Sequence, residues 1–227
     1  MSEMRCIHRH TKIEHPACFK LGQLRMSPPP GPMPKLIPWY LNIDGTPNMR
    51  IGYLDIESDG FAGNFNIMLS WSLKERGGKV FTDHVTKRDL FYGNRDRRIT
   101  KTLIDCMRHF DIICTYYGTK FDIPFVRTRA IYHGLEFPGY AEIIHFDLCY
   151  VVKRVFKLNR STLDNAARLI RVAENKNHID WEIWNLAHFG DAKSLEYVME
   201  HNILDVKVLE ELHYVLEPLN KWTKRSI

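Results

Sequence analysis

Residues 50–60 read RIGYLDIESDG, an apolar run that carries two carboxylates, Asp55 and Glu57, before it breaks at a glycine. Side chains alternate faces in a strand, so Asp55 and Glu57 share one face while Leu54 and Ile56 share the other. Two like charges side by side repel each other unless a cation lies between them, and hard carboxylate oxygens suit Mg²⁺ or Mn²⁺. An edge strand with two solvated acids is the simple alternative. The interpretation therefore depends on whether further acids converge on this strand.

Length and composition are those of a globular protein. The chain has 227 residues and 44% hydrophobic content, enough for one well-buried domain and a small appendage. A formal net charge of +5 and a sequence pI near 8.9 permit a polyanionic partner without requiring one. Five cysteines, odd in number and scattered, fit buried thiols in a reducing compartment better than a disulfide framework.

The expected location follows from what the sequence lacks. No charged-then-apolar leader opens the chain, and no run approaches the ~20 apolar residues of a membrane span. We therefore expect a cytoplasmic protein, or one of the host cytoplasm if it is viral, with no membrane partner.

Three segments differ in composition. Residues 1–26 are polar and contain His and Cys, and residues 27–38 are rich in proline. Proline at this density precludes helix and central strand, so residues 27–38 are expected to form a stiff linker or an extended arm. The compact domain is expected to occupy residues 39–227.

The amino-terminal segment contains side chains that can bind zinc, namely Cys6, His8, His10, His15 and Cys18. No Cys-x-x-Cys pair is present, so the signal is weak. A structural Zn²⁺ is one interpretation, and an arm that docks on the compact domain is the favoured one.

The order of elements in the compact domain predicts its fold class. Strands are expected at residues 51–56, 65–73, 79–85, 111–116 and 143–146. Helices are expected at residues 97–110, 122–132, 147–156, 162–170, around 181–188, and 192–216. Short loops join the first three strands. The pattern predicts an α/β fold with a mixed five-stranded sheet, a three-stranded antiparallel meander plus two further strands, flanked by helices.

A second acidic site lies where a strand ends and a helix begins. Residues 117–125 read YGTKFDIPF, so the strand ends near Gly118 and the helix starts near Asp122. An Asp at this position is often a helix N-cap, which is the simple interpretation. In an open α/β sheet, however, sites form where strands end and helices begin, and this strand is expected beside the Asp55 strand.

A third acidic site lies on the last helix. His201 and Asp205 are four residues apart, so they share a helix face that is expected to continue through Leu204, Val208 and Leu212. A buried carboxylate is costly alone, so Asp205 needs a cation, a donor network or a raised pKa. A salt bridge to a Lys or Arg is the alternative.

Together these acids and the element order resemble the DEDD superfamily of ribonuclease H-like 3′–5′ exonucleases. The stretch DIESDG at residues 55–60 looks like that family's strand-one Asp-x-Glu. The stretch GTKFDIPF at residues 118–125 is similar to the second exonuclease motif of family B DNA polymerase proofreading domains. His201 to Asp205 looks like the Tyr-x-x-x-Asp of the tyrosine branch, with His in the tyrosine place. The resemblance spans about residues 49–216 and leaves the first ~48 residues unexplained.

The resemblance implies a ribonuclease H-like fold and a metal-dependent 3′–5′ exonuclease of DNA replication or repair. By a two-metal-ion mechanism it would release nucleoside 5′-monophosphates. The implied ligands of two Mg²⁺ or Mn²⁺ ions are Asp55, Glu57, Asp122 and Asp205. His201 is the favoured water-activating residue and Tyr197 a less favoured stand-in, although the histidine branch usually separates its His and Asp numbers by five rather than four.

The resemblance also implies a substrate. Single-stranded or frayed 3′ ends are expected, with DNA favoured over RNA. Ser58 and Gly60 are expected beside the terminal nucleotide. Phe121 or Phe125 is a candidate to lie near a base, although core packing is the favoured role for either ring. The three arginines within residues 95–98 form a basic cluster that can hold phosphates or simply be solvated.

Two other functions stay open. The same fold can serve as a nucleic-acid or protein platform whose chemistry is weakened by the His201 change. The same acids can also support a structure-specific endonuclease.

Overall fold

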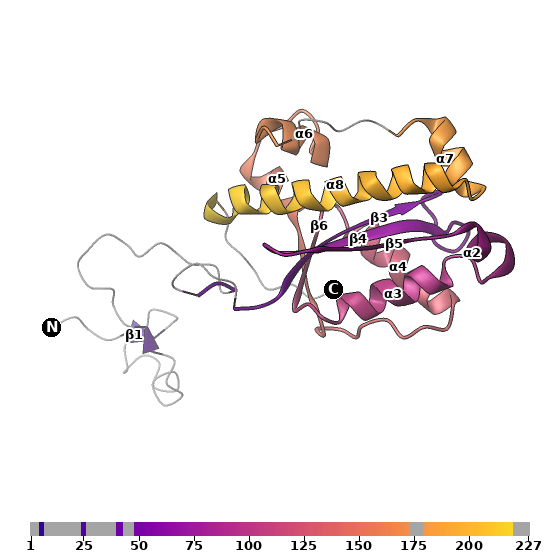
Figure 1. Ribbon diagram of the computed structural model, residues 1–227. Helices are drawn as coiled ribbons and strands as arrows, with labels where there is room; N and C mark the ends of the chain where they lie inside the picture. The colour runs from indigo at the N-terminus through magenta and orange to yellow at the C-terminus, as the bar shows by residue number, and fades with distance from the viewer. Residues whose placement is uncertain (1–4, 7–23, 26–39, 43–47, 173–178, 220–227) are drawn as a thin grey trace. The chain divides into compact units, whose positions relative to one another are not determined.

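The computed structural model describes residues 5–6, 24–25, 40–42, 48–172 and 179–219 (Figure 1). The chain divides into two units, Met1–Ile37 and Pro38–Ile227. In the first unit, strands β1 (Arg5–Cys6) and β2 (Leu24–Arg25) pair antiparallel. The proposed linker of residues 27–38 and the proposed zinc ligands, apart from the backbone of Cys6, lie outside the described residues.

The second unit is built on a five-stranded sheet with the order β5-β4-β3-β6-β7. Its strands are β3 (Ile51–Ser58), β4 (Met68–Glu75), β5 (Val80–His84), β6 (Ile112–Thr115) and β7 (Ile144–Asp147). The first three form an antiparallel meander, whereas β6 pairs parallel with β3 and with β7. The predicted fold class is confirmed.

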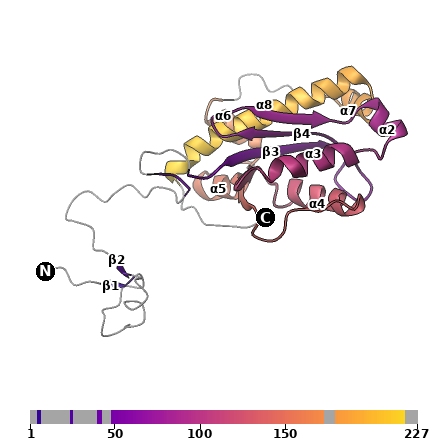
Figure 2. The ribbon, with the colours of Figure 1, turned by 60° about the horizontal axis from the view of Figure 1, so that its bottom comes forward.

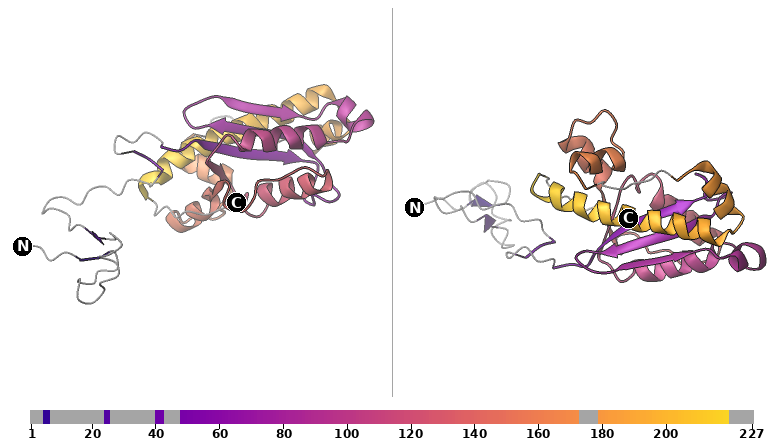
Figure 3. Two further views of the ribbon diagram at one scale, coloured as in Figure 1. Left: turned by 90° about the horizontal axis from the view of Figure 1, so that it is seen from below. Right: turned by 45° about the horizontal axis from the view of Figure 1, so that its top comes forward.

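Helices cover both faces of this sheet. The long helix α8 (Ala192–Leu216) crosses one face, seen from its own side at the right of Figure 3. Helices α3 (Arg97–Met107) and α4 (Asp122–Tyr132) lie on the opposite face, which comes forward in Figure 2. The remaining helices are α2 (Lys87–Tyr92), α5 (Leu148–Val155), α6 (Leu163–Leu169), α7 (Trp181–His188) and the 3₁₀ turn η1 (Glu217–Leu219).

The central strand β3 separates two apolar clusters because its side chains alternate. Ile51 and Tyr53 belong to the cluster under α8, and Leu54 and Ile56 to the cluster under α3 and α4. All four are at most 3% exposed. Each such side chain contributes about 1.5–3 kcal/mol by leaving water. The packing fixes the register of β3, so the next residues on the α8 face are the two acids.

One helix was not predicted, and one strand begins later than expected. Helix α2 was not predicted because its six residues have no helical period of apolar side chains. A capping box between Thr86 and Asp89 stabilises its start. Strand β4 begins at Met68 rather than Phe65, because the amide of Phe65 bonds to the carbonyl of Ala62 in a turn (2.9 Å). Phe65 is therefore 79% exposed.

None of the helices in the described ranges is long and apolar enough to cross a bilayer. Cys114 and Cys149 are buried free thiols, and Cys106 is a half-buried one.

Candidate functional site

Carboxylates from three elements meet on the α8 face of β3. The strand supplies Asp55 and Glu57 near its carboxyl end, and α8 passes over this face. Strand β6 runs parallel beside β3, so the chain leaving β6 toward α4 emerges at the same end of the sheet. That chain carries Asp122, and α8 carries Asp205.

Glu57, His201 and Asp205 form a compact group. One ligand atom from each lies within 4.8 Å of the other two. His201 Nε2 is 3.9 Å from Asp205 Oδ2. Glu57 and His201 are half-buried and Asp205 is buried; Tyr197, one turn earlier on α8, is half-buried. Two carboxylates and an imidazole at this separation are a donor set that suits a divalent cation.

Asp122 is turned inward rather than capping its helix. It is the first residue of α4, the N-cap is Phe121, and no side chain caps the helix. Asp122 Oδ1 instead accepts a hydrogen bond from the amide of Ile56 between the two β3 acids (3.1 Å). The N-cap interpretation is therefore wrong, because the carboxylate reaches across to the neighbouring strand.

The electrostatics at Asp122 favour a cation. Burial raises the pKa of its carboxyl from 3.8 to about 7, and the carboxylates of Asp147 and Asp205 add to the rise. Without a cation, burial therefore disfavours the charged form of this carboxyl. A bound divalent ion would reverse this shift, so the residues present fit a metal centre.

Asp55 is held by a residue that the sequence did not single out. Asn202 Nδ2 donates to Asp55 Oδ2 (2.6 Å), and Asn202 is fully buried. Its Oδ1 has no hydrogen-bond partner among the described residues. The predicted helix face was wrong in one member, because Leu204 is 41% exposed while Asn202 faces the sheet. Its position three residues before Asp205 is the signal that could have found it.

Asp147 is a second residue that sequence reasoning missed. It is the N-cap of α5 and accepts from the amide of Cys149 (3.0 Å). The same carboxylate accepts from the amides of Tyr117 (2.8 Å) and Thr119 (3.0 Å), in the loop that leads to Asp122. Tyr117 has φ +66°, in the left-handed region. Asp147 thus holds a strained loop in place behind Asp122.

A cavity of about 650 Å³ opens beside Glu57. Its walls come from the end of β3, the loop after it, the start of α4 and helix α7. They are Glu57, Ser58, Asp59, Gly60, Phe61, Phe121, Trp181, Trp184, Asn185 and His188. The predicted substrate residues Ser58, Gly60 and Phe121 are all among them. The residues from α7 were not predicted, although two tryptophans in one short helix were a visible signal.

Contacts across the cavity fix its shape. The rings of Phe61 and Phe121 meet edge to face with centroids 6.1 Å apart. His188 Nδ1 lies 2.7 Å from Asp59 Oδ2, which ties α7 to the end of β3. Figure 1 shows this end of β3 next to α7. The site is therefore a group of acids that opens into a cavity with aromatic walls.

Comparison with known proteins agrees with this arrangement. The sequence model of the RNase_H superfamily matches residues 52–217. The chain is 28% identical over 214 residues to the DNA polymerase of Pyrococcus glycovorans, covering 82% of this chain and 27% of the polymerase. It is 29% identical over 195 residues to DNA polymerase 1 of Pyrococcus abyssi, covering 75% of this chain and 25% of the polymerase.

A solved structure has the same fold. The family B DNA polymerase from the hyperthermophilic archaeon Pyrobaculum calidifontis superimposes with a TM-score of 0.62 at 20% sequence identity, covering 76% of this chain and 25% of that one. The chain thus spans about a quarter of the length of the polymerases it matches. The resemblance predicted from the motifs is confirmed by these matches.

Proposed function

Because this chain belongs to the RNase_H superfamily, we propose that it is a metal-dependent nuclease that removes nucleotides from 3′ ends of single-stranded or frayed DNA. One observation carries the proposal: ligand atoms of Glu57, His201 and Asp205 lie within 4.8 Å of one another, and Glu57 also lines the aromatic cavity. The similarity to archaeal DNA polymerases supports DNA as the polymer.

Asp55, Glu57, Asp122 and Asp205 would hold two Mg²⁺ or Mn²⁺ ions. Such a pair of ions supplies an activated water and stabilises the leaving 3′ oxygen. Within the protein, Asn202 orients Asp55 and Asp147 supports the loop before Asp122. His201 would accept the proton of the attacking water, because imidazole is the side chain that exchanges protons near neutral pH.

The cavity accounts for action at an end. A terminal base would lie against the rings of Phe121 and Trp181, with Ser58 and Gly60 beside its sugar. Stacking on aromatic rings contributes about 1–3 kcal/mol per base and tolerates every base. A base stacked on these rings would be separated from its pairing partner, so an unpaired end is the expected substrate. The products would be nucleoside 5′-monophosphates.

The decisive assay is digestion of a single-stranded DNA with Mn²⁺ by the wild type and by Asp55→Ala. We expect stepwise shortening of a 5′-labelled strand by the wild type and none by the variant. Asp105→Ala, an exposed acid on α3, is the matched control and should digest normally. Full digestion by Asp55→Ala would refute the proposal.

Two further substrates separate the remaining alternatives. A circular single strand has no end, so its cleavage would identify an endonuclease instead. Retained DNA binding without digestion, together with no uptake of Mn²⁺ in calorimetry, would identify a binding module. A matched RNA strand, digested more slowly than DNA, would support the choice of polymer.

A further inference from the structure

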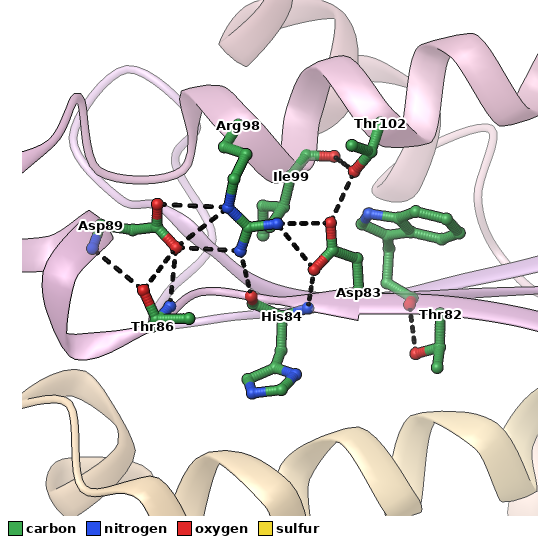
Figure 4. A network of polar contacts seen from close by, with 9 residues as sticks. Thr82, Asp83, His84, Thr86, Asp89, Arg98, Ile99 and Thr102 are labelled. Carbon is green, nitrogen blue, oxygen red and sulfur yellow. Dashed lines mark hydrogen bonds and ion pairs between the residues drawn. The ribbon is translucent and has the colours of Figure 1, made fainter.

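The three arginines at the start of α3 and just before it, Arg95, Arg97 and Arg98, have different environments. Arg98 is fully engaged: its Nη1 lies 2.7 Å from Asp83 Oδ2, and its Nη2 lies 2.9 Å from Asp89 Oδ2 (Figure 4). Its Nη2 also donates to the carbonyl of His84 (2.7 Å). This guanidinium clamps β5, α2 and α3 together, so it is unavailable to a ligand.

Arg95 and Arg97 are different. Both are exposed, and no carboxylate among the described residues lies within ion-pair distance of either. They line a second cavity of about 430 Å³ with Gly93, Asn94, Tyr132 and His133. Two cations without neutralising acids beside a cavity are complementary to an anion.

The residue between them explains why they face outward. Asp96 is fully buried and forms an ion pair with Arg129 (2.6 Å). Its other oxygen accepts from the amide of Met68 (3.0 Å). Asp96, the one acid within residues 95–98, is thus paired inside the fold. Arg95 has φ +49°, so its backbone is held in the left-handed region by these fixed neighbours.

The second cavity lies at the same end of the sheet as the candidate site. Asp96 bonds to Met68, and Met68 pairs directly with Ser58 of the first cavity. Arg129 also donates to the carbonyl of Gly63 (2.9 Å), in the loop that carries Phe61. Helix α4 therefore runs from the first cavity, lined by Phe121 at its start, to the second cavity, lined by Tyr132 and His133 at its end.

We propose that Arg95 and Arg97 bind backbone phosphates of the single strand whose 3′ end occupies the candidate site, an inference that rests on the proposed function. Guanidinium groups recognise phosphate oxygens in a planar, bidentate manner. The ring of Tyr132, 65% exposed at the same cavity, offers a surface on which an unpaired base stacks. Basic groups interleaved with an exposed ring suit a single strand better than a duplex.

The test measures how binding of a fluorescein-labelled single-stranded DNA depends on salt, in EDTA so that no hydrolysis occurs. The variant is Arg95→Asn with Arg97→Gln, because Asn tolerates positive φ. Each phosphate contact on a single strand contributes about −0.7 to the slope of log K against log salt. We expect about tenfold weaker binding at moderate salt and a slope less steep by about 1.4.

The matched control removes two other exposed arginines, Arg154→Ala with Arg160→Ala, at the far end of α5 and beyond. Equal affinity and slope in the two double variants would overturn the proposal. The single variants, each expected to lose about half of the slope change, serve if the double variant unfolds.

A mononucleotide substrate keeps this result separate from the nuclease proposal. The p-nitrophenyl ester of thymidine 5′-monophosphate is too short to reach the second cavity. Its Mn²⁺-dependent hydrolysis should stay within twofold of wild type in the Arg95 and Arg97 variant. If the wild type hydrolyses neither ester nor DNA while the slope change persists, the proposed function fails and the phosphate surface stands.

Discussion

The side-chain amide of Asn202 on α8 donates a 2.6 Å hydrogen bond to the carboxylate of Asp55 on the central strand. The two residues are far apart in sequence; Asn202 is fully buried and Asp55 is half-buried. It joins the helix that carries Asp205 to the strand that carries Asp55 and Glu57. The spacing of the proposed ligands therefore depends on an uncharged residue.

Replacing Asn202 by Ala should weaken metal binding more than it weakens the fold. Loss of a residue that orients a metal ligand typically costs 10–100-fold in metal affinity or activity. The lost buried hydrogen bond should lower the free energy of unfolding by about 1–3 kcal/mol. Calorimetric titration with Mn²⁺ and thermal unfolding measure the two effects. Asn64→Ala, at an exposed position in the loop after β3, should change neither; unchanged Mn²⁺ affinity in Asn202→Ala would contradict the assignment.

Asp122 should make the stability of the metal-free protein depend on pH. Its folded-state pKa is raised to about 7, mainly by burial, so the folded protein stays protonated where the unfolded chain ionises. The stabilising contribution is complete below pH ~4 and is lost as the pH rises through about 7, on the order of a few kcal/mol. Chemical denaturation in EDTA across this range measures it.

Asp122→Asn is the control for that titration, because an amide oxygen still accepts from Ile56 but carries no charge. At pH ~8 in EDTA the variant should be more stable than wild type. Added Mn²⁺ should stabilise the wild type at this pH and leave the variant nearly unchanged. Parallel pH curves for both proteins would show that Asp122 is not the titrating group.

The helices of this chain were easier to predict than its site. The bounds of α4, α7 and α8 match the expected ranges, because long apolar periods with clear stops define a helix locally. The start of β4 does not match the expected range, since a turn at Ala62 competes with the strand pattern. Local patterns carry no information about which distant side chains will meet.

The same limit applies to the site. Four acids could be singled out because an acid within an apolar pattern is conspicuous. Asn202 is uncharged, and Asp147 is the first residue of an expected helix, where the structure makes it the N-cap. Asn202 can bond to Asp55 only because α8 lies over β3. Asp147 can hold the loop before Asp122 only because that loop lies beside the start of α5. The metal and catalytic roles of the predicted residues stay predictions for the experiments described.

Gly52 should be intolerant of any side chain. A Cβ there would lie 2.7 Å from Leu73 Cδ2 and 3.0 Å from the ring of Phe110. Overpacking of a filled core costs about 1–3 kcal/mol, so Gly52→Ala should lower the melting temperature by several degrees. Gly139→Ala is the control, since its Cβ would meet only a flexible Glu142 oxygen at 3.7 Å. Equal melting temperatures would show that the core yields at Gly52.

His201 should act on the rate of hydrolysis rather than on substrate binding. A positioned base typically contributes 10²–10⁴-fold, so His201→Asn should lower kcat by about that factor with little change in KM. If His201 were a metal ligand instead, the variant would lose Mn²⁺ affinity in titration. His201→Tyr, which restores the residue of the tyrosine branch, should recover part of the rate.

Trp181 should bind substrate without taking part in the chemistry. Its side chain is 79% exposed on α7 and lines the cavity beside Glu57, so Trp181→Ala removes a stacking surface but little core packing. A stacked base contributes about 1–3 kcal/mol, which predicts a KM raised by roughly 5–150-fold with kcat within twofold. Tyr140→Ala, an aromatic that is 90% exposed, should leave KM unchanged. An equal fall in kcat and kcat/KM in Trp181→Ala would instead place the ring against the transition state.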